Sequence, residues 1–350
     1  MITGQVRAIL PNDIDERPPM DAITTRPPLD AQVATWRRDG AVILDRFFPS
    51  DQIKAVEADC DTLFAARRRS HEAVTKTPAG AVGVFDPAQF RNQDHLPFAA
   101  SPAINLLGLD ARLIAFAKAA LGVEDVRLYQ CDAWAKFTGD ADYDQPFHCD
   151  FKNHTLTVPG DDPAERTINF MIYVTDVSDD LGAIHYVPNP EATPIVGPLH
   201  PVLPEEAAGG ATLSRDTLSL AQDHATPFAH PMQQALKAIE RSGAAPAGSI
   251  FAYGIDVYHR GTNLTRPGGH RYTITASYKA AGNDQIGWSA WPFHFLKPWA
   301  NVIHHASPEQ LACLGIPRPG DPFWTETTLA RAQLRWPGWD MAPWREAAAA

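Results

Sequence analysis

Apolar residues in the first third of the chain recur at the spacing of α-helices. After Ser50, which we expect to be an N-cap, they return every three or four positions as far as Phe64. Another such stretch stops at Gly122, a residue type common at helix ends. The pattern predicts a mainly helical first third. The expected elements are helices over 29–38, after Ser50 and over 111–121, with a strand over 41–45.

The pattern changes after Val126. From there, short segments rich in β-branched and aromatic residues are separated by Pro, Gly, Asn and Asp. This is typical of strands, and several strands without long helices between them favour a barrel or a double-sheet jelly roll. The expected fold is mainly β with flanking helices. The predicted strands cover residues 126–137, 166–175, 184–187, 249–253 and 271–278.

Three segments depart from this β pattern. Residues 1–27, rich in Pro and charge, are expected to form an irregular arm in front of a domain at 28–285. Residues 197–245 hold helix-like pieces, one of them over 231–241. Such an insertion is either a lid over a substrate or a packed structural excursion. Residues 286–350 are rich in aromatics, which we expect to pack over the domain, and which hint at an apolar or small organic substrate.

Charge and composition limit the kinds of molecule that the protein is expected to bind. The net charge of -11 and the scattered Lys and Arg residues argue against nucleic acid, and more weakly against a coenzyme A thioester. The longest basic cluster, 67–69, is expected at a helix end. Without an apolar run of roughly 20 residues or a secretion signal, we expect a cytoplasmic protein that has no membrane partner. The four cysteines form no CxxC pair and are expected to be buried free thiols.

One short motif, His148-Cys149-Asp150, carries candidate chemistry. In an extended segment, residues two apart project to the same face, so His148 and Asp150 can reach one point. An imidazole and a carboxylate are two ligands of the 2-His-1-carboxylate facial triad. The motif alone is weak evidence, because such a histidine can simply bond a nearby turn.

The best candidate for a third ligand is His259, which follows a predicted strand and precedes a Gly-Thr-Asn turn. A structural histidine that caps this turn is the alternative. Of the other histidines, His154 could touch substrate, although a surface loop is favoured, and His185 is expected in the core or a pocket.

Arg271 opens the last predicted strand, twelve positions after His259 (271 − 259). There its guanidinium can bind a carboxylate as a two-pronged, charge-assisted partner. A dicarboxylate cosubstrate needs such a partner, because one of its ends chelates the metal. Arg266 is a rival, but it lies in a Pro-Gly-Gly turn and is expected to face solvent.

Together these motifs resemble the phytanoyl-CoA dioxygenase (PhyH) family of iron(II) and 2-oxoglutarate dependent oxygenases, whose fold is a double-stranded β-helix (jelly-roll, cupin-like). The resemblance runs from about residue 38 to 280. One departure is Pro188-Asn189-Pro190, where the family usually has Pro-Gly-Ser-His. The segments that carry the resemblance are 38–45, 148–150, 172–177, 181–188, 259–263 and 271–278.

The resemblance implies that His148, Asp150 and His259 are the catalytic iron(II) ligands. Arg271 would bind the distal carboxylate of 2-oxoglutarate. Three further residues are candidates for contacts with the cosubstrate. The alternative is that each of them only forms hydrogen bonds on its strand face. They are Lys136, Asn169 and Thr273.

The expected activity is hydroxylation of a small organic substrate by dioxygen, with release of succinate and carbon dioxide. Asp150 stands where related halogenases have a small residue, so a hydroxylase is expected rather than a halogenase. Two alternatives remain. The same ligands could serve a redox-inert metal (zinc) enzyme on a cupin-like barrel, although Arg271 has no role there. The chain could also be a catalytically silent binding member, although no ligand is missing.

Overall fold

The computed structural model describes most of the chain between residues 29 and 349. The predicted arm at 1–27 lies outside the described residues, as does most of the insertion at 197–245, so neither prediction about them is tested. The described residues are 29–72, 92–139, 144–155, 160, 162–197, 231–287 and 298–349.

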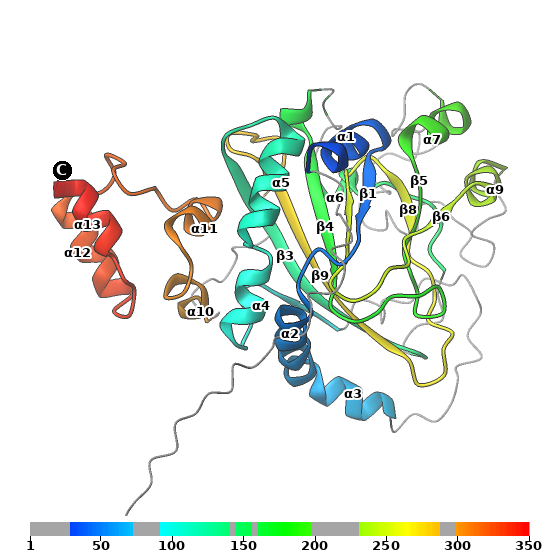
Figure 1. The fold of residues 1–350 in the computed structure, drawn as a ribbon, viewed down its shortest axis with the longest axis horizontal. Coiled ribbons are helices and arrows are strands. Elements are labelled where there is room, and N and C mark those ends of the chain that lie inside the picture. Colours follow the sequence, from blue (N-terminus) through cyan, green and yellow to red (C-terminus); the bar gives the residue numbers. More distant parts are fainter. Residues whose placement is uncertain are drawn as a thin grey trace, which may run out of the picture.

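A six-stranded antiparallel sheet forms the larger layer (Figure 1), with strand order β1-β7-β4-β9-β3-β2. The neighbours are not consecutive in sequence, as in a jelly roll. The longest pairing joins β3 to β9, from Val126 opposite Ala280 to Phe137 opposite His270, with one bulge after Leu128. The strands are β1 Ala41–Leu44, β2 Gln93–His95, β3 Val126–Phe137, β4 Thr167–Tyr173, β7 Ile250–Tyr253 and β9 His270–Ala280.

A second, three-stranded sheet lies beside the larger one, with order β6-β5-β8. The two sheets meet through buried rings, since Tyr186 of the small sheet lies 4.9 Å, centroid to centroid, from Phe251 of the large one. The predicted double-sheet fold with flanking helices is thus confirmed. The strands of the small sheet are β5 His185–Val187, β6 Arg241–Ser242 and β8 Tyr258–Arg260.

Helices cover one face of the large sheet, and Figure 1 shows α5 lying across its strands. Phe116 of α5 packs edge-on against Phe170 of β4, with ring centroids 5.7 Å apart. As predicted, α5 ends at Gly122, which adopts the left-handed conformation (φ 68°) that glycine tolerates best. The helices of the first third are α1 Leu29–Asp39, α2 Ser50–Leu63, α3 Ala65–Glu72, α4 Pro102–Leu107 and α5 Ala111–Leu121.

Alternation along the strands separates two environments. In β9, Tyr272 and Ile274 face the helices and are fully buried. Because successive side chains of a strand point to opposite faces, Arg271 and Thr273 point the other way, toward the small sheet. The inner face of the large sheet therefore carries polar side chains in a buried setting, which is where a site would be built.

Three local predictions need correction. Ser50 is the first helical residue rather than the N-cap, because Pro49 already occupies that position in an extended conformation. The basic cluster at 67–69 lies within a separate short helix, α3, where Arg68 pairs with Asp61 at 2.8 Å. The helix predicted over 231–241 ends earlier, because Arg241 pairs with Tyr186 of β5 and becomes strand β6.

The C-terminal segment forms four short helices, α10 Ala300–Ile303, α11 Pro308–Cys313, α12 Glu326–Arg335 and α13 Ala342–Ala349, which Figure 1 shows to one side of the large sheet. Lys118 of α5 and Glu309 of α11 form an ion pair at 2.5 Å. Trp324, Trp339 and Trp344 are buried against one another. These tryptophans hold the last helices together rather than line a pocket.

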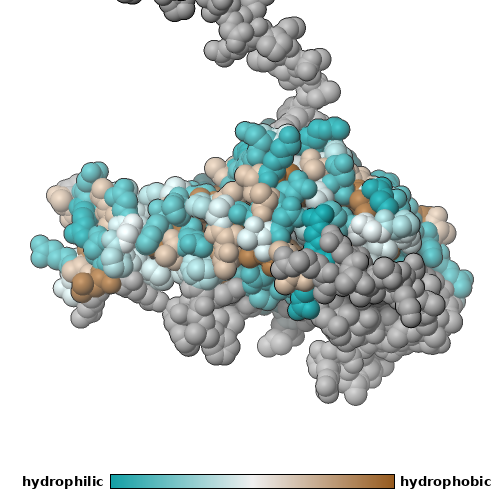
Figure 2. Space-filling model, turned by 90° about the horizontal axis from the view of Figure 1, so that it is seen from below, coloured by the Kyte–Doolittle hydropathy of each residue, from teal (hydrophilic) through white to brown (hydrophobic). Residues whose placement is uncertain are grey.

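Among the described residues, the exposed large apolar side chains are Leu29, Ile239, Phe323 and Leu334, and in Figure 2 hydrophobic residues are interspersed with hydrophilic ones over the coloured part of the face seen from below. All four cysteines are buried free thiols, as predicted. Among the described helices, none combines the length and the apolar character that a membrane span requires.

Replacing Trp344 by Ala tests the role of the tryptophan cluster. Trp344 is 1% exposed and donates a hydrogen bond to the carbonyl of Pro317 at 3.0 Å. We expect the change to lower the free energy of unfolding by about 3–5 kcal/mol, measured by urea denaturation. Leu334→Ala, at a position 82% exposed on α12, is the control and should change little. Equal effects of the two substitutions would contradict a structural role for the cluster.

Candidate functional site

The space between the two sheets contains a cavity of about 300 Å³. Every residue that the sequence singled out for the metal or the cosubstrate lines it. The structure thus brings together side chains that lie up to 137 positions apart in sequence (273 − 136). These residues are Lys136, His148, Asp150, Asn169, His259, Arg271 and Thr273.

Three side chains converge at one end of this cavity. His148, Asp150 and His259 each offer one ligand atom, and the three atoms lie within 4.8 Å of one another. The Nε2 atom of His148 is 3.6 Å from Oδ1 of Asp150, and the Nε2 atom of His259 is 3.5 Å from its Oδ2. One carboxylate and two imidazoles on a shared point form the donor set of a facial triad.

The backbone sets this convergence. His148 and His259 face each other in an antiparallel bridge, with two N–H···O bonds of 3.0 Å, so their rings lie side by side. The segment that carries His148 is also held from α9 (Pro231–Ala238), where the Gln233 amide bonds both the N–H and the carbonyl of Phe147. Asp150 then ends the segment, just before the short helix α6 (Phe151–His154).

Hydrogen bonds also fix which nitrogen of each ring is available. Nδ1 of His148 donates to the carbonyl of Pro146, and Nδ1 of His259 to that of Val257, each at 2.9 Å. In this neutral tautomer, Nε2 carries the lone pair and points toward Asp150. Metal-binding histidines are usually oriented through the other ring nitrogen in this way, so the residues present fit a metal ion.

Asp150 has the ionised form that a metal ligand requires. In the metal-free site, burial alone would raise the pKa of Asp150, but His259 and His148 in their protonated form outweigh it and hold that pKa well below its ordinary value. Asp150 is therefore an ionised carboxylate. The Tyr253 hydroxyl donates to its Oδ2 atom at 3.2 Å and fixes its orientation.

The other end of the cavity is cationic. Lys136 and Arg271 are opposite each other on β3 and β9, and Arg271 is 7% exposed. Burial lowers the pKa of Arg271 to about 10, and burial together with Arg271 lowers the pKa of Lys136 to about 7. No described residue accepts a hydrogen bond from Nε of Arg271. A buried guanidinium without a partner is costly, so this end fits a carboxylate ligand.

The two remaining cosubstrate candidates lie at different levels of the sheet. Thr273 lies one inward position from Arg271, opposite Tyr173 of β4. Asn169 lies farther along, opposite Ser277 and Tyr253, and its Oδ1 accepts from the Tyr129 hydroxyl at 3.4 Å. Thr273 is therefore near the cationic end, and Asn169 is in the row of Tyr253, which contacts Asp150.

The favoured prediction for His154, a surface loop, was wrong, and its position agrees with the alternative that it could touch substrate. His154 lies on α6, lines the cavity and has its Nδ1 atom 2.6 Å from the Tyr129 hydroxyl. Burial lowers its pKa, so the ring is neutral. Sequence reasoning also missed Tyr253 and Tyr129. Alternation along the predicted strand 249–253 could have placed Tyr253 inward, but the bulge in β3 disguises Tyr129.

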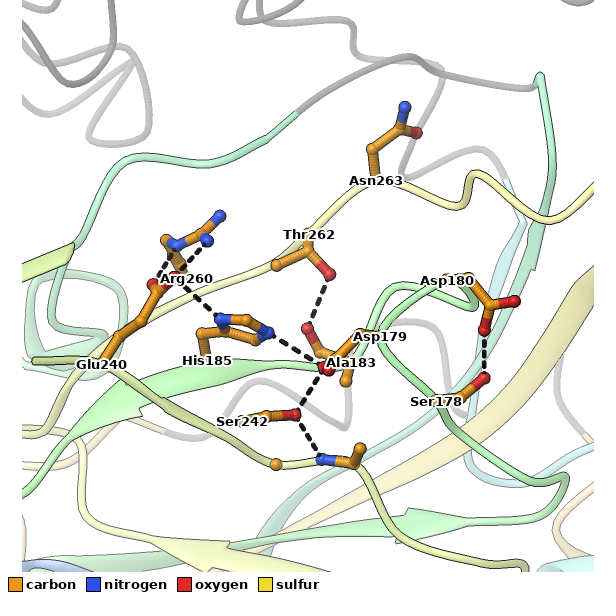
Figure 3. A network of polar contacts seen from close by, with 12 residues as sticks. Ser178, Asp179, Asp180, Ala183, His185, Glu240, Ser242, Arg260, Thr262 and Asn263 are labelled. Atoms are coloured by element: carbon orange, nitrogen blue, oxygen red, sulfur yellow. Dashed lines mark hydrogen bonds and ion pairs between the residues drawn. The ribbon is translucent and has the colours of Figure 1, made fainter. Parts of the chain in front are cut away.

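A polar network supports the strand that carries His259 (Figure 3). Arg260 donates to both oxygens of Glu240, at 2.6 and 2.8 Å, and His185 lies 3.0 Å from Glu240 and 3.1 Å from Asp179. His185 was expected in the core or a pocket. It is instead a partly buried ion-pair residue of the small sheet and is not among the residues that line the cavity. Because Arg260 directly follows His259, the network holds β8 in place.

The chain belongs to the phytanoyl-CoA dioxygenase (PhyH) family, whose model matches residues 36–265. The resemblance drawn from the motifs is thereby confirmed.

Arg266, the rival of Arg271, is exposed, as predicted, and it pairs with Asp180 at 2.8 Å. No curated protein gives a match.

Similar solved structures include three proteins. The non-heme alpha ketoglutarate dependent epimerase SnoN from nogalamycin biosynthesis is 14% identical, with 72% of this chain and 83% of that chain covered and a TM-score of 0.45. HygX from Streptomyces hygroscopicus, with nickel and 2-oxoglutarate bound, is 18% identical over 72% and 87% of the chains, with a TM-score of 0.46. AviO1 from Streptomyces viridochromogenes Tue57 is 18% identical over 75% and 96%, with a TM-score of 0.45.

Removal of one imidazole tests the metal site. We expect His148→Ala to weaken iron(II) binding roughly 100-fold or more, because even changes beyond the ligands themselves cost 10–100-fold. Anaerobic titration calorimetry measures the affinity. His305→Ala, at an exposed position outside the cavity, is the control. Unchanged iron binding by the His148 variant would refute the assignment.

The network in Figure 3 predicts a pH-dependent contribution to stability. Burial alone would lower the pKa of His185, but Glu240 and Asp179 outweigh it and raise that pKa above its ordinary value. The contribution of protonated His185 is therefore complete below about pH 6.5 and is lost as the pH rises through the raised value.

We expect His185→Gln to lower the free energy of unfolding by roughly 1 kcal/mol near pH 6, after allowance for solvent screening, and by less at pH 8. Urea denaturation at both pH values measures the difference. His305→Gln controls for the substitution itself. A deficit that grows with rising pH would have the wrong sign and would exclude the ion pair as its cause.

Proposed function

We propose that this protein is an iron(II) and 2-oxoglutarate dependent dioxygenase that hydroxylates a small organic molecule. One observation carries the proposal. A single cavity has a complete His-Asp-His donor set at one end, and at the other the buried Arg271 guanidinium opposite the partly buried Lys136. A ligand that chelates a metal with one end and carries a carboxylate at the other satisfies both.

In this proposal, His148, Asp150 and His259 hold the iron. With iron and 2-oxoglutarate bound, the site supplies oxidative chemistry in which dioxygen oxidises the substrate and 2-oxoglutarate becomes succinate and carbon dioxide. The protein contributes geometry. The backbone carbonyls that accept from the two imidazoles keep both Nε2 atoms aimed at one point, and the Tyr253 hydroxyl orients the carboxylate.

The cationic end would bind the distal carboxylate of the cosubstrate. The Arg271 guanidinium pairs with it, and Lys136 adds a second positive charge from the neighbouring strand. Thr273 is the hydroxyl on the same strand face. Binding of an anion would relieve the repulsion between the two cations, so the empty site favours a carboxylate even before any metal contact is made.

The side chains at the site favour hydroxylation over the alternative activities. Asp150 supplies a third protein ligand at the position that is small in related halogenases, so it leaves no place for a halide, and hydroxylation is favoured. A redox-inert zinc enzyme would have no use for Arg271 and Lys136 lining the same cavity. A catalytically silent member would have no need for two imidazoles already oriented toward a carboxylate.

Arg271→Ala tests the cosubstrate site. Apo-protein is titrated anaerobically with iron(II) and 2-oxoglutarate while the visible metal-to-ligand charge-transfer band is recorded. We expect a band that requires both additions. In the variant, the concentration of 2-oxoglutarate needed to form it should rise roughly 100-fold, as expected when one partner of a buried charge pair is removed.

Arg266→Ala is the matched control, because Arg266 is an exposed arginine on the preceding turn and is paired with Asp180. It should leave the titration unchanged. Absence of the band in the natural chain, with tight zinc binding instead, would overturn the oxygenase assignment. Equal titrations of the Arg271 and Arg266 variants would overturn the assignment of Arg271 alone.

A further inference from the structure

The cavity has a polar wall that neither the metal ligands nor the cationic end uses. It lies along β2 and β3 and is built around Asp132, a carboxylate only 2% exposed. In the sheet, Asp132 is opposite His95 of β2 on one side and Thr275 of β9 on the other. Its side chain therefore lies on the inner face of the sheet, as does that of Arg271, which comes four residues before Thr275 in β9 (275 − 271).

Three side chains bond this carboxylate. The Nε2 atoms of Gln93 and Gln130 both donate to Oδ2, at 3.1 and 2.5 Å, and Nδ1 of His95 lies 2.5 Å from Oδ1. An ionised carboxylate only accepts hydrogen bonds, so each glutamine must turn its NH₂ group toward Asp132. This fixes the orientation of both amides.

Because both amides bond Asp132 through nitrogen, their oxygens are left to face elsewhere. Gln93 and Gln130 both line the cavity, and no described residue donates to either Oε1 atom. The wall therefore presents a pair of hydrogen-bond acceptors to whatever occupies the cavity, with a buried negative charge behind them. Each amide keeps a second N–H as well, but only a ligand with its own O–H or N–H groups can satisfy both amide oxygens, which an ether cannot do.

The wall extends along the cavity from the level of the triad toward the cationic end. Gln130 is in the row of Ser277, Asn169 and Tyr253, and the Tyr253 hydroxyl bonds Asp150. Trp134 is opposite both Gln93 and Thr273, in a row two residues from Arg271 along β9 (273 − 271). A ligand that bonds both glutamines would therefore lie beside the dicarboxylate, with one edge at the level of the triad.

Trp134 supplies the apolar part of the same wall. It is opposite Gln93 across the β2–β3 pairing, points to the inner face and lines the cavity. An indole face stacks well against the C–H face of a ring. Acceptors that flank an aromatic face suit a ring with hydroxyl or amine groups on its edge.

From this arrangement we infer that the substrate is a hydroxylated ring, such as a sugar or cyclitol unit, bound through its own donors. Its O–H groups, or N–H groups in an amino-substituted ring, donate to Oε1 of Gln93 and of Gln130 while one ring face packs on Trp134. Asp132 is a positioning residue that acts through the two amides. The inference rests on the proposed function, because the ring would bind beside the metal triad.

The test compares ring probes whose donors are free with the same rings after methylation of those donors. The rings are myo-inositol, methyl glucoside and glucosamine, each set against its fully O-methylated form, with the amine of glucosamine dimethylated as well. Saturation-transfer NMR on the full chain loaded with zinc(II) measures binding and requires no turnover. We expect the ring with free donors to bind at least about 10-fold more tightly in at least one pair.

The double variant Gln93→Met, Gln130→Met should lose that preference, bringing the ratio close to one. Gln333→Met is the matched control, because the amide of Gln333 also donates through Nε2, to carbonyls of the C-terminal segment such as that of Trp336. It should keep the preference. Should the double variant fail to fold, the comparison of probes on the natural chain still decides.

Three results would overturn the inference: equal binding of the free and methylated rings, a preference that survives in the double variant, or binding of no ring in any pair. Failure of the proposed function is separate. It would appear as a missing iron and 2-oxoglutarate absorption band in the titration described above, whatever the ring probes do.

Discussion

The pairing of β3 with β9 is the interaction on which the rest of the structure depends. It runs from Val126 opposite Ala280 to Phe137 opposite His270 and sets the alternation of both strands. One face is apolar and buries the helices of the first third. The other is polar and forms the floor of the cavity, so a slip of one residue would exchange core and site along the whole length of the pair.

That constraint explains how so much charge can be buried in one place. Lys136 is opposite Arg271 because the register leaves no other arrangement, and their repulsion is part of the folded state. Other pairs of the same sheet offset this cost. A dianion bound between the two cations would therefore stabilise the folded chain as well as occupy the site, which couples cosubstrate binding to stability.

The sequence predicted the long elements and the short strands β1, β5 and β7, but it missed β2, β6 and β8. β3 and α5 were recognisable because their patterns extend over eleven or twelve residues. Strands β2, β6 and β8 have only two or three residues, too few for any period, and they form because neighbouring strands pair with them. The metal and cosubstrate candidates came from spacing and family resemblance. The glutamine wall could not, since Gln93 and Gln130 meet only through the β2–β3 register and a shared carboxylate.

The two sheets divide the work of the site. The small sheet and the segment bridged to it hold the imidazoles through backbone contacts, so the orientation of His148 and His259 does not depend on a bound metal. The large sheet instead presents side chains, with Arg271 and Lys136 at one end and the amides of Gln93 and Gln130 along β2 and β3. Evolution of a new substrate preference can therefore alter Gln93, Gln130 or Trp134 without disturbing the triad, because the two sets of residues share a cavity but not a backbone element.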